Sequence, residues 1–307
     1  MIQFHILLNQ LIQFFIILLI GYVAARYQMV KEVYLPELSR IIMKIVLPVY
    51  IFTSIFNGTT IKQLINGIPV LFLSIAIYVI FILTFSLLAK ILKLPGERGN
   101  VYQALFIFGN TAIIALPLIN EMYPKEGIIY LALFAIIDQL IFWTYGIWLT
   151  TSKQQGMKAN LKNFINPSLV AVALSILLIV IRVKLPIVLN NTLNTVGKAS
   201  TAMCLIYLGS LFYFSNWKKV LNKREIYIGI VFKMILIPLI IGIVLHIIDL
   251  SLSMRGTMVI LSALPTMTVI PMLVKPNSEE KEYAIGATLF TMAVSLITLP
   301  IVTYLVL

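Results

Sequence analysis

Two interrupted apolar stretches decide the fold of this chain: Gly109-Asn110-Thr111-Ala112-Ile113-Ile114-Ala115-Leu116-Pro117 and Ala263-Leu264-Pro265-Thr266-Met267-Thr268-Val269-Ile270-Pro271. An offset of 154 residues aligns them and places Pro117 on Pro271. Small, hydroxyl and proline residues break an apolar helix in each stretch. Matched interruptions in two halves of a membrane protein are the best sequence indication of a transporter binding site. We therefore expect the chain to move a solute.

The composition places most of the chain in a membrane. Of the 307 residues, 61% are hydrophobic and 11% are charged, and the mean hydropathy is +1.03. A helix needs roughly 20 apolar residues to cross the hydrocarbon, whereas a strand of a membrane barrel needs only about 9–11 alternating ones. The long apolar runs therefore predict an all-α integral membrane protein with ten transmembrane helices, at 4–25, 36–57, 67–92, 99–121, 127–151, 166–183, 189–214, 225–248, 253–274 and 282–306.

Basic residues concentrate in alternate loops of this prediction. Odd-numbered loops contain Arg26 and Lys31; Lys90, Lys93 and Arg98; Lys153, Lys158 and Lys162; Lys218, Lys219, Lys223 and Arg224; and Lys275 and Lys281. Even-numbered loops contain only Lys62, Lys125, Arg182, Lys184 and Arg255. Because Lys and Arg stay on the cytoplasmic side during insertion, we expect a multi-pass protein of the cell (cytoplasmic) membrane with both termini outside. The net charge of +12 is spread over these short loops, which indicates contact with the lipid bilayer and not with nucleic acid.

The ten predicted helices divide into two sets of five. We expect a first repeat at 1–151, a cytoplasmic linker at 152–165 and a second repeat at 166–307. Because five is odd, the two repeats run through the membrane in opposite directions, as in transporters built from inverted repeats. Residue identity between the halves is poor outside the aligned prolines, so this prediction rests on hydropathy and on the position of the breaks.

The two breaks predict the substrate-binding residues. Pro117, Pro265 and Pro271 cannot complete a helical hydrogen-bond ladder, and the freed backbone groups are costly in hydrocarbon unless they line a polar cavity. The ends of half-helices also carry partial charges that suit an ion. Ordinary proline kinks, as expected at Pro48, Pro238 and Pro300, are the alternative. Two aligned breaks that carry Asn or Thr favour a site formed by Asn110, Thr111, Pro117, Pro265, Thr266 and Thr268.

Ionisable residues inside predicted spans suggest coupling or gating. Asp138 falls near the middle of the fifth span, where an acid costs roughly 2.5–3.5 kcal/mol on insertion scales. A bound proton, a coupling cation or a buried lysine could offset that cost. Lys44 and Lys233 are candidates, because each lies about eight residues inside the cytoplasmic end of its span. Long lysine stems can instead snorkel to the membrane surface, and that alternative stays open for both.

The sequence lacks the residue patterns of membrane enzymes. It has one cysteine, Cys204, and two histidines, His5 and His246, so it contains no zinc-binding His-Glu-x-x-His motif. Asp138 has no second membrane acid for an aspartyl protease, and no Gly-rich phosphate loop is present. We expect neither an enzyme, a metal site nor a cofactor, and we consider proton coupling.

Gly109-Asn110-Thr111 through Leu116-Pro117-Leu118 resembles the fourth-helix motif of the auxin efflux carrier family, which includes bacterial malonate or malate permeases and the plant PIN carriers. Similarity extends over essentially the whole chain, through Leu47-Pro48, Asn166-Pro167, Lys233 to Pro238, Ala263-Leu264-Pro265, Val274-Lys275, Ala287 to Leu289 and Leu299-Pro300.

The resemblance implies a 5+5 inverted repeat in which broken helices 4 and 9 cross, as in sodium/proton antiporters and bile-acid symporters. It also implies elevator-like transport of small carboxylates, often by a homodimer. Asn110, Thr111 and the crossover at Pro265 match positions that contact substrate in the family. Plant carriers have proline where this chain has Gly109 and a long hydrophilic central loop where it has a short junction, which makes auxin itself a doubtful substrate.

Three function classes follow from these patterns. The first is a secondary transporter of small organic anions, such as malonate, malate or an auxin-like aromatic acid. The second is a cation/proton antiporter of the same architecture, although that activity usually needs paired acids at the crossover and this chain has one. The third, a membrane protein without transport, leaves the aligned breaks without a purpose.

Overall fold

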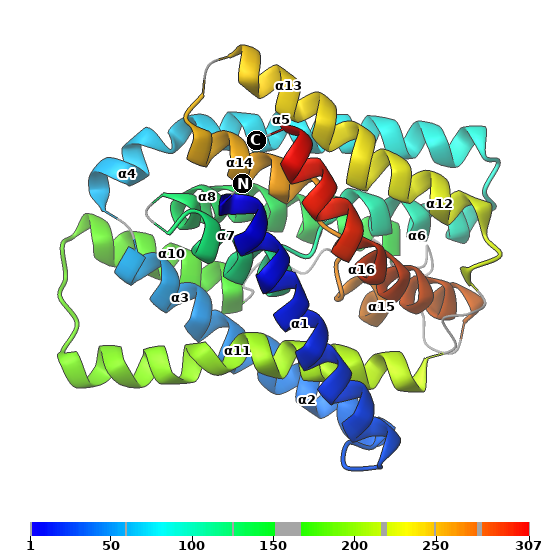
Figure 1. Ribbon diagram of the computed structural model, residues 1–307, viewed down its shortest axis with the longest axis horizontal. Helices are drawn as coiled ribbons and strands as arrows, with labels where there is room; N and C mark the ends of the chain where they lie inside the picture. Colours follow the sequence, from blue (N-terminus) through cyan, green and yellow to red (C-terminus); the bar gives the residue numbers. More distant parts are fainter. Residues whose placement is uncertain are drawn as a thin grey trace. The chain divides into compact units, whose positions relative to one another are not determined.

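The computed structural model describes residues 2–58, 60–124, 126–150, 167–215, 220–248, 250–274 and 278–306. Every regular element in these ranges is a helix (Figure 1), and the one extended pairing is an isolated bridge between Gly109 and Thr266. Two shorter apolar helices cover Ile12–Arg26 and Val170–Val180. Six helical stretches are long and apolar enough to cross a membrane, at Glu32–Gly58, Ile61–Ile91, Gly127–Thr150, Ile187–Phe214, Arg224–Ile247 and Glu279–Val306. The prediction of an α-helical membrane protein is therefore confirmed at this level.

The chain folds into two compact units that interleave along the sequence. Unit 1 comprises Met1–Ile68, Ala112–Ile136 and Ile165–Phe214, and unit 2 comprises Pro69–Thr111, Ile137–Phe164 and Ser215–Leu307. The units therefore do not coincide with the predicted halves 1–151 and 166–307. The halves are a prediction about an internal repeat in the sequence, whereas the units are groups of residues that contact one another. The predicted linker at 152–165 lies outside the described residues, and the repeat itself stays a prediction.

Unit 1 is built around a long helix, α11, that contacts α1 and α3; α3 also packs against α10. The α1–α11 contact is close because Gly21 faces the backbone of Ile206 and Gly209 faces the backbone of Leu18. The elements of unit 1 are α1 (Ile2–Arg26), η1 (Glu32–Tyr34), α2 (Leu35–Ile41), η2 (Ile42–Val46), α3 (Leu47–Gly58), α4 (Ile61–Asn66), α7 (Leu116–Met122), the first part of α8 (Gly127–Ile141), α10 (Pro167–Val180) and α11 (Ile187–Phe214).

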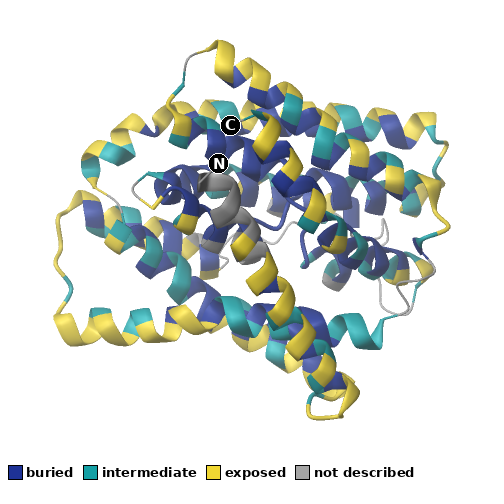
Figure 2. Ribbon diagram, in the orientation of Figure 1, coloured by how far each residue is buried: buried dark blue, intermediate teal, exposed yellow. Residues whose placement is uncertain are grey.

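Unit 2 packs α16 against α6, α13, α14 and α15. Its elements are α5 (Ile68–Ile91), α6 (Gly96–Ile107), η4 (Phe142–Gly146), α9 (Ile147–Thr150), α12 (Arg224–Val231), η7 (Phe232–Leu236), α13 (Ile237–Ile247), α14 (Leu252–Ser262), α15 (Ile270–Leu273) and α16 (Glu279–Val306). Aromatic rings of α5 and α6 stack at its centre, with Phe85 and Phe106 centroids 5.6 Å apart. Helices α6 and α14 are buried over most of their length (Figure 2).

Both predicted interruptions are present in the structure. The predicted span 99–121 consists of α6, which ends at Ile107, the π-turn η3 (Thr111–Ala115) and α7. The predicted span 253–274 consists of α14, which ends at Ser262, and the single turn α15. Each break leaves a short non-helical stretch between its half-helices.

Three prolines that lie inside predicted spans each follow a π-turn. The turns η2, η3 and η7 end two residues before Pro48, Pro117 and Pro238, respectively. Proline lacks an amide hydrogen and its ring clashes with the preceding turn, so widening that turn by one residue relieves the clash. Pro300, in contrast, lies inside the uninterrupted helix α16. The expectation of ordinary kinks at Pro48 and Pro238 therefore missed the π-turns.

The close contact of α1 with α11 predicts a strong sensitivity to side-chain size at Gly209. A Cβ at this position would lie 1.9 Å from the Leu18 carbonyl oxygen, a backbone atom that cannot move aside. We expect Gly209→Ala to destabilise the protein by about 1–3 kcal/mol, as overpacking does elsewhere, and to lower the thermal unfolding midpoint in detergent. Gly96→Ala is the matched control, because nothing lies within 4 Å of a Cβ there. Equal midpoints for the two variants would contradict the packing.

Candidate functional site

The two interruptions meet in unit 2 as a short antiparallel backbone crossing. The amide of Asn110 donates to the carbonyl oxygen of Pro265 over 2.9 Å, and the amide of Met267 donates to that of Phe108 over 3.1 Å. These two bonds make the bridge that pairs Gly109 with Thr266. The predicted juxtaposition of the two breaks is therefore a property of the structure, with backbone groups freed in one helix satisfied by the other.

The closeness of the crossing explains the residue at position 109. A Cβ on Gly109 would lie 2.9 Å from the Cβ of Leu264 and 3.7 Å from the carbonyl oxygen of Leu261. Any larger residue would push the two chain segments apart and lengthen the bonds made by Asn110 and Met267. Thr111 then begins the next turn, and its amide donates to the Gly109 carbonyl over 2.9 Å.

Asp138 lies on α8 with no exposed surface and is surrounded by hydrogen-bond donors. Its carboxylate accepts from the Tyr78 hydroxyl, from Gln139 Nε2 at 3.0 Å and from Thr111 Oγ1 at 3.4 Å. Tyr78 comes from α5 and Thr111 from the first break, so three separate segments converge on one acid. Hydrogen bonds of this kind offset part of the cost of burying a carboxylate.

Lys233 is the buried cation of the same unit, with 1% of its surface exposed. Its ammonium donates to the carbonyl oxygen of Ile107 over 3.3 Å and lies 3.4 Å from the centroid of the Phe81 ring. Ile107 is the last residue of α6, where a helix carries partial negative charge. Lys233 also interacts electrostatically with Asp138. The break thus supplies a partner for the cation as well as for the acid.

A chain of hydroxyl groups anchors the second break. The Thr266 amide donates to Thr291 Oγ1 at 3.2 Å, and the two hydroxyl oxygens are 3.0 Å apart. Thr291 in turn donates to the carbonyl oxygen of Thr288 over 2.9 Å. Both Thr288 and Thr291 lie on α16, so this helix holds the crossing in place by side-chain hydrogen bonds.

The remaining predicted site residues have different positions. Asn110 and Thr268 are buried beside the crossing in unit 2. Lys44 lies in η2 of unit 1 with an exposed side chain, so it is not part of this cluster. Pro117 lies in α7, within unit 1, and its side chain is outside what the structure describes.

Sequence reasoning missed Tyr78, Gln139 and Thr291. A single tyrosine or threonine is common in an apolar helix, so none of them stands out alone. A weak signal was available on α16, where hydroxyl residues recur at Thr288, Thr291, Ser295 and Thr298, three or four positions apart. That spacing places them on one helix face.

Several apolar helices long enough to cross a membrane, together with two interrupted helices that cross inside the bundle, define a multi-pass membrane protein of the transporter class. The comparison with protein families agrees with this class. Residues 6–303 match the model of the membrane transport protein family, which covers auxin efflux carrier-like proteins. The chain therefore belongs to this family, and the resemblance noted in the sequence is confirmed.

A relative has been found in Methanocaldococcus jannaschii, where it is described as an uncharacterized transporter. It is 26% identical over 203 residues, which cover 63% of this chain and 65% of the relative. The matched region is thus a little under two-thirds of the relative's length. The family is one of transporters and not of enzymes.

The hydrogen bond from the Thr266 amide predicts a stabilising role for the Thr291 hydroxyl. Thr291→Val leaves this buried amide without its acceptor, which costs about 1–3 kcal/mol for a typical buried group, so we expect a lower thermal midpoint in detergent. Thr291→Ser keeps the hydroxyl and most of the stability. Thr298→Val is the control, because within the described residues the Thr298 hydroxyl bonds only to its own helix, at the Val294 carbonyl. A midpoint for Thr291→Val equal to that of the control would contradict this role.

Proposed function

We propose that the chain is a secondary active transporter of small organic anions. The substrate class is carboxylates such as malonate or malate, or an auxin-like aromatic acid. One observation carries the proposal: two aligned breaks cross inside an apolar unit and present hydrogen-bonding groups where lipid-facing helices have none. In hydrocarbon, irregular backbone is tolerated only where it is buried in protein or lines a cavity.

The side chains at the crossing fit an anion. Asn110, Thr111, Thr266 and Thr268 are buried there and carry amide or hydroxyl donors. Lys233 adds a positive charge that is held at the end of α6. Binding and release by such donors requires no covalent chemistry, which agrees with a transporter.

The proposed architecture has ten membrane helices in a 5+5 inverted repeat, with both termini outside the cell membrane. Transport would follow an elevator-like, alternating-access motion. The paired segments of the crossing, from Phe108 to Thr111 and from Pro265 to Met267, all lie within unit 2, which is compatible with this mechanism. Assembly as a homodimer, as the family resemblance implies, belongs to the same proposal.

Coupling is assigned to the buried charges. Asp138 accepts a hydrogen bond from Thr111, which belongs to the first break, so the protonation of the acid can influence the substrate site directly. Lys233 is the proposed buried gating partner, and Lys44, which is exposed in unit 1 and lies outside this cluster, is proposed as a separate gating residue. A buried acid such as Asp138 would also attract a cation. Its hydrogen bond with Thr111, at the first break, is the observation that keeps a cation/proton antiporter as the second candidate.

Asn110→Ala and Thr266→Ala test the substrate site. Each removes a donor at the crossing, and we expect a Km for labelled malonate or malate raised about tenfold, because a hydrogen bond to a charged group contributes about 1.5–3 kcal/mol. Uptake into proteoliposomes measures this effect. The matched controls are Asn66→Ala and Thr144→Ala, whose side chains are exposed.

The same uptake assay separates the candidate functions. Unchanged Km values in both site variants would mean that the breaks have only a structural role. If none of malonate, malate and an aromatic acid moves while a sodium or proton flux is measured, the carboxylate proposal fails and the antiporter replaces it.

Asp138→Asn tests proton coupling. The amide keeps the size of the acid and cannot exchange a proton, so we expect carboxylate uptake that no longer responds to a pH gradient across the vesicle membrane. Wild-type uptake should change with the gradient, and Glu97→Gln, a change at an exposed acid, should leave that response intact. A wild-type response in Asp138→Asn would remove the acid from the coupling mechanism.

A further inference from the structure

One face of α11 is polar in a helix that is otherwise suited to a membrane. Asn190, Asn191, Asn194, Thr195 and Lys198 follow one another at helical spacing, which places them on one side of the helix. All five are at least partly exposed. Lys198 lies eleven residues beyond Ile187, roughly 16 Å along the helix axis. Charged and amide groups at that depth are costly against lipid, so this face requires an aqueous or ligand-filled neighbour.

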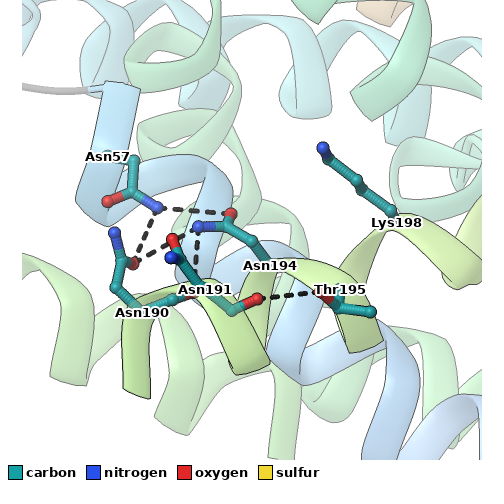
Figure 3. Close-up of a pocket in the computed structure, with 6 residues that line it drawn as sticks. All are labelled: Asn57, Asn190, Asn191, Asn194, Thr195 and Lys198. Atoms are coloured by element: carbon teal, nitrogen blue, oxygen red, sulfur yellow. Dashed lines mark hydrogen bonds between the residues drawn. The ribbon is translucent and has the colours of Figure 1, made fainter. Parts of the chain in front are cut away.

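The polar face lines a pocket within unit 1. Its volume is about 660 Å³, which lies within the range of roughly 300–1,000 Å³ of small-molecule sites. The lining residues are Asn57, Asn190, Asn191, Asn194, Thr195 and Lys198 (Figure 3). All of them carry polar side chains and none is acidic.

Hydrogen bonds between α3 and α11 shape this pocket. Asn57 Nδ2 donates to the side-chain oxygens of Asn190 at 3.1 Å and of Asn194 at 3.4 Å. Gly197 permits close approach of the two helices, since a Cβ there would lie 3.0 Å from Thr53 Oγ1 and 3.1 Å from the Cα of Tyr50. These hydrogen bonds link the amide groups of Asn57, Asn190 and Asn194 across the two helices.

We propose that this pocket is a second carboxylate-binding site, with Lys198 as its charged contact. The inference rests on the proposed function, because the same anion that binds at the crossing would bind here. Lys198 forms no hydrogen bond or ion pair with the part of the chain that the structure describes, and Figure 3 shows it extending from the same helix as the three Asn side chains. A free ammonium beside fixed amides suits a small carboxylate.

The orientation proposed above places the pocket near the outer surface. Asn57 lies next to the end of α3, and Asn190 lies near the start of α11. The loop that follows α3 and the loop that precedes α11 are both assigned to the outside. The pocket is thus proposed as a substrate site at the outer side of the membrane. It lies in unit 1, whereas the crossing lies in unit 2.

The first experiment measures whether water and carboxylate reach this face. The chain has one cysteine, the buried Cys204, so a Cys204→Ala background gives single-cysteine variants. We expect Thr195→Cys to react with a charged methanethiosulfonate reagent applied to both sides of the membrane, and malonate to slow the reaction. Val196→Cys is the control: Val196 is 37% exposed but points away from the polar face. Adding Lys198→Gln should weaken malonate protection at least tenfold, as expected for loss of a charged hydrogen bond.

The second experiment measures transport. Lys198→Gln should raise the Km for malonate uptake about tenfold, whereas Lys198→Arg should retain most of the affinity because it keeps the charge. Lys184→Gln, which removes an exposed lysine just before α11, is the matched control and should behave as the wild type.

The outcomes distinguish the two proposals. Wild-type uptake of malonate with no protection of Thr195→Cys overturns the pocket and leaves the transport proposal in place. Equal reactivity of Thr195→Cys and Val196→Cys also overturns it, because the polar face would then be no wetter than the opposite one. Protection that depends on Lys198, in a protein that transports no carboxylate, supports the pocket while the proposed function fails.

Discussion

The structure depends on the pairing of two backbone segments that have left their helices. Inside an apolar bundle a freed amide or carbonyl has no water to bind, so an interrupted helix is stable only if something else completes its hydrogen bonds. Here each break completes the other, through Asn110 with Pro265 and Met267 with Phe108. The pairing requires a close approach of the two segments, which glycine at position 109 permits.

The buried charges of unit 2 depend on the same breaks. Lys233 binds a carbonyl at the end of α6, and Asp138 accepts from Thr111, where the chain becomes helical again. A continuous helix would have used that carbonyl for its own ladder. The interruption therefore provides polar partners for two ionisable groups within a few residues of the crossing, so a change in the breaks would alter the hydrogen bonds of both groups.

Much of this arrangement could be predicted from the sequence, because a polar or proline residue inside a long apolar run is easy to recognise. The breaks, Asp138 and Lys233 all appear as polar interruptions of long hydrophobic runs. Tyr78 could not be predicted, since a tyrosine is unremarkable in a membrane helix and only packing brings it to the site. Thr291 had only the weak signal of its spacing from other hydroxyl residues on α16. Lys44 and Lys233 occupy similar positions ahead of a proline, yet one is exposed and the other is buried. Sequence spacing places a residue in a helix, but tertiary contacts decide what that face meets.

The π-turns have a consequence for the comparison of the two halves. In the proposed repeat, the helices that contain η2, η4 and η7 correspond to α11, α16 and α5, which are uninterrupted. A π-turn uses one residue more than an α-turn, so the side chains that follow it are rotated by about 100° relative to a regular helix. If residues of the two halves are aligned at one constant offset, the residues beyond each of these turns are therefore matched to side chains on a different face of the corresponding helix. Gapped alignment, with single-residue insertions at the three turns, is the appropriate way to compare the two halves of the proposed repeat.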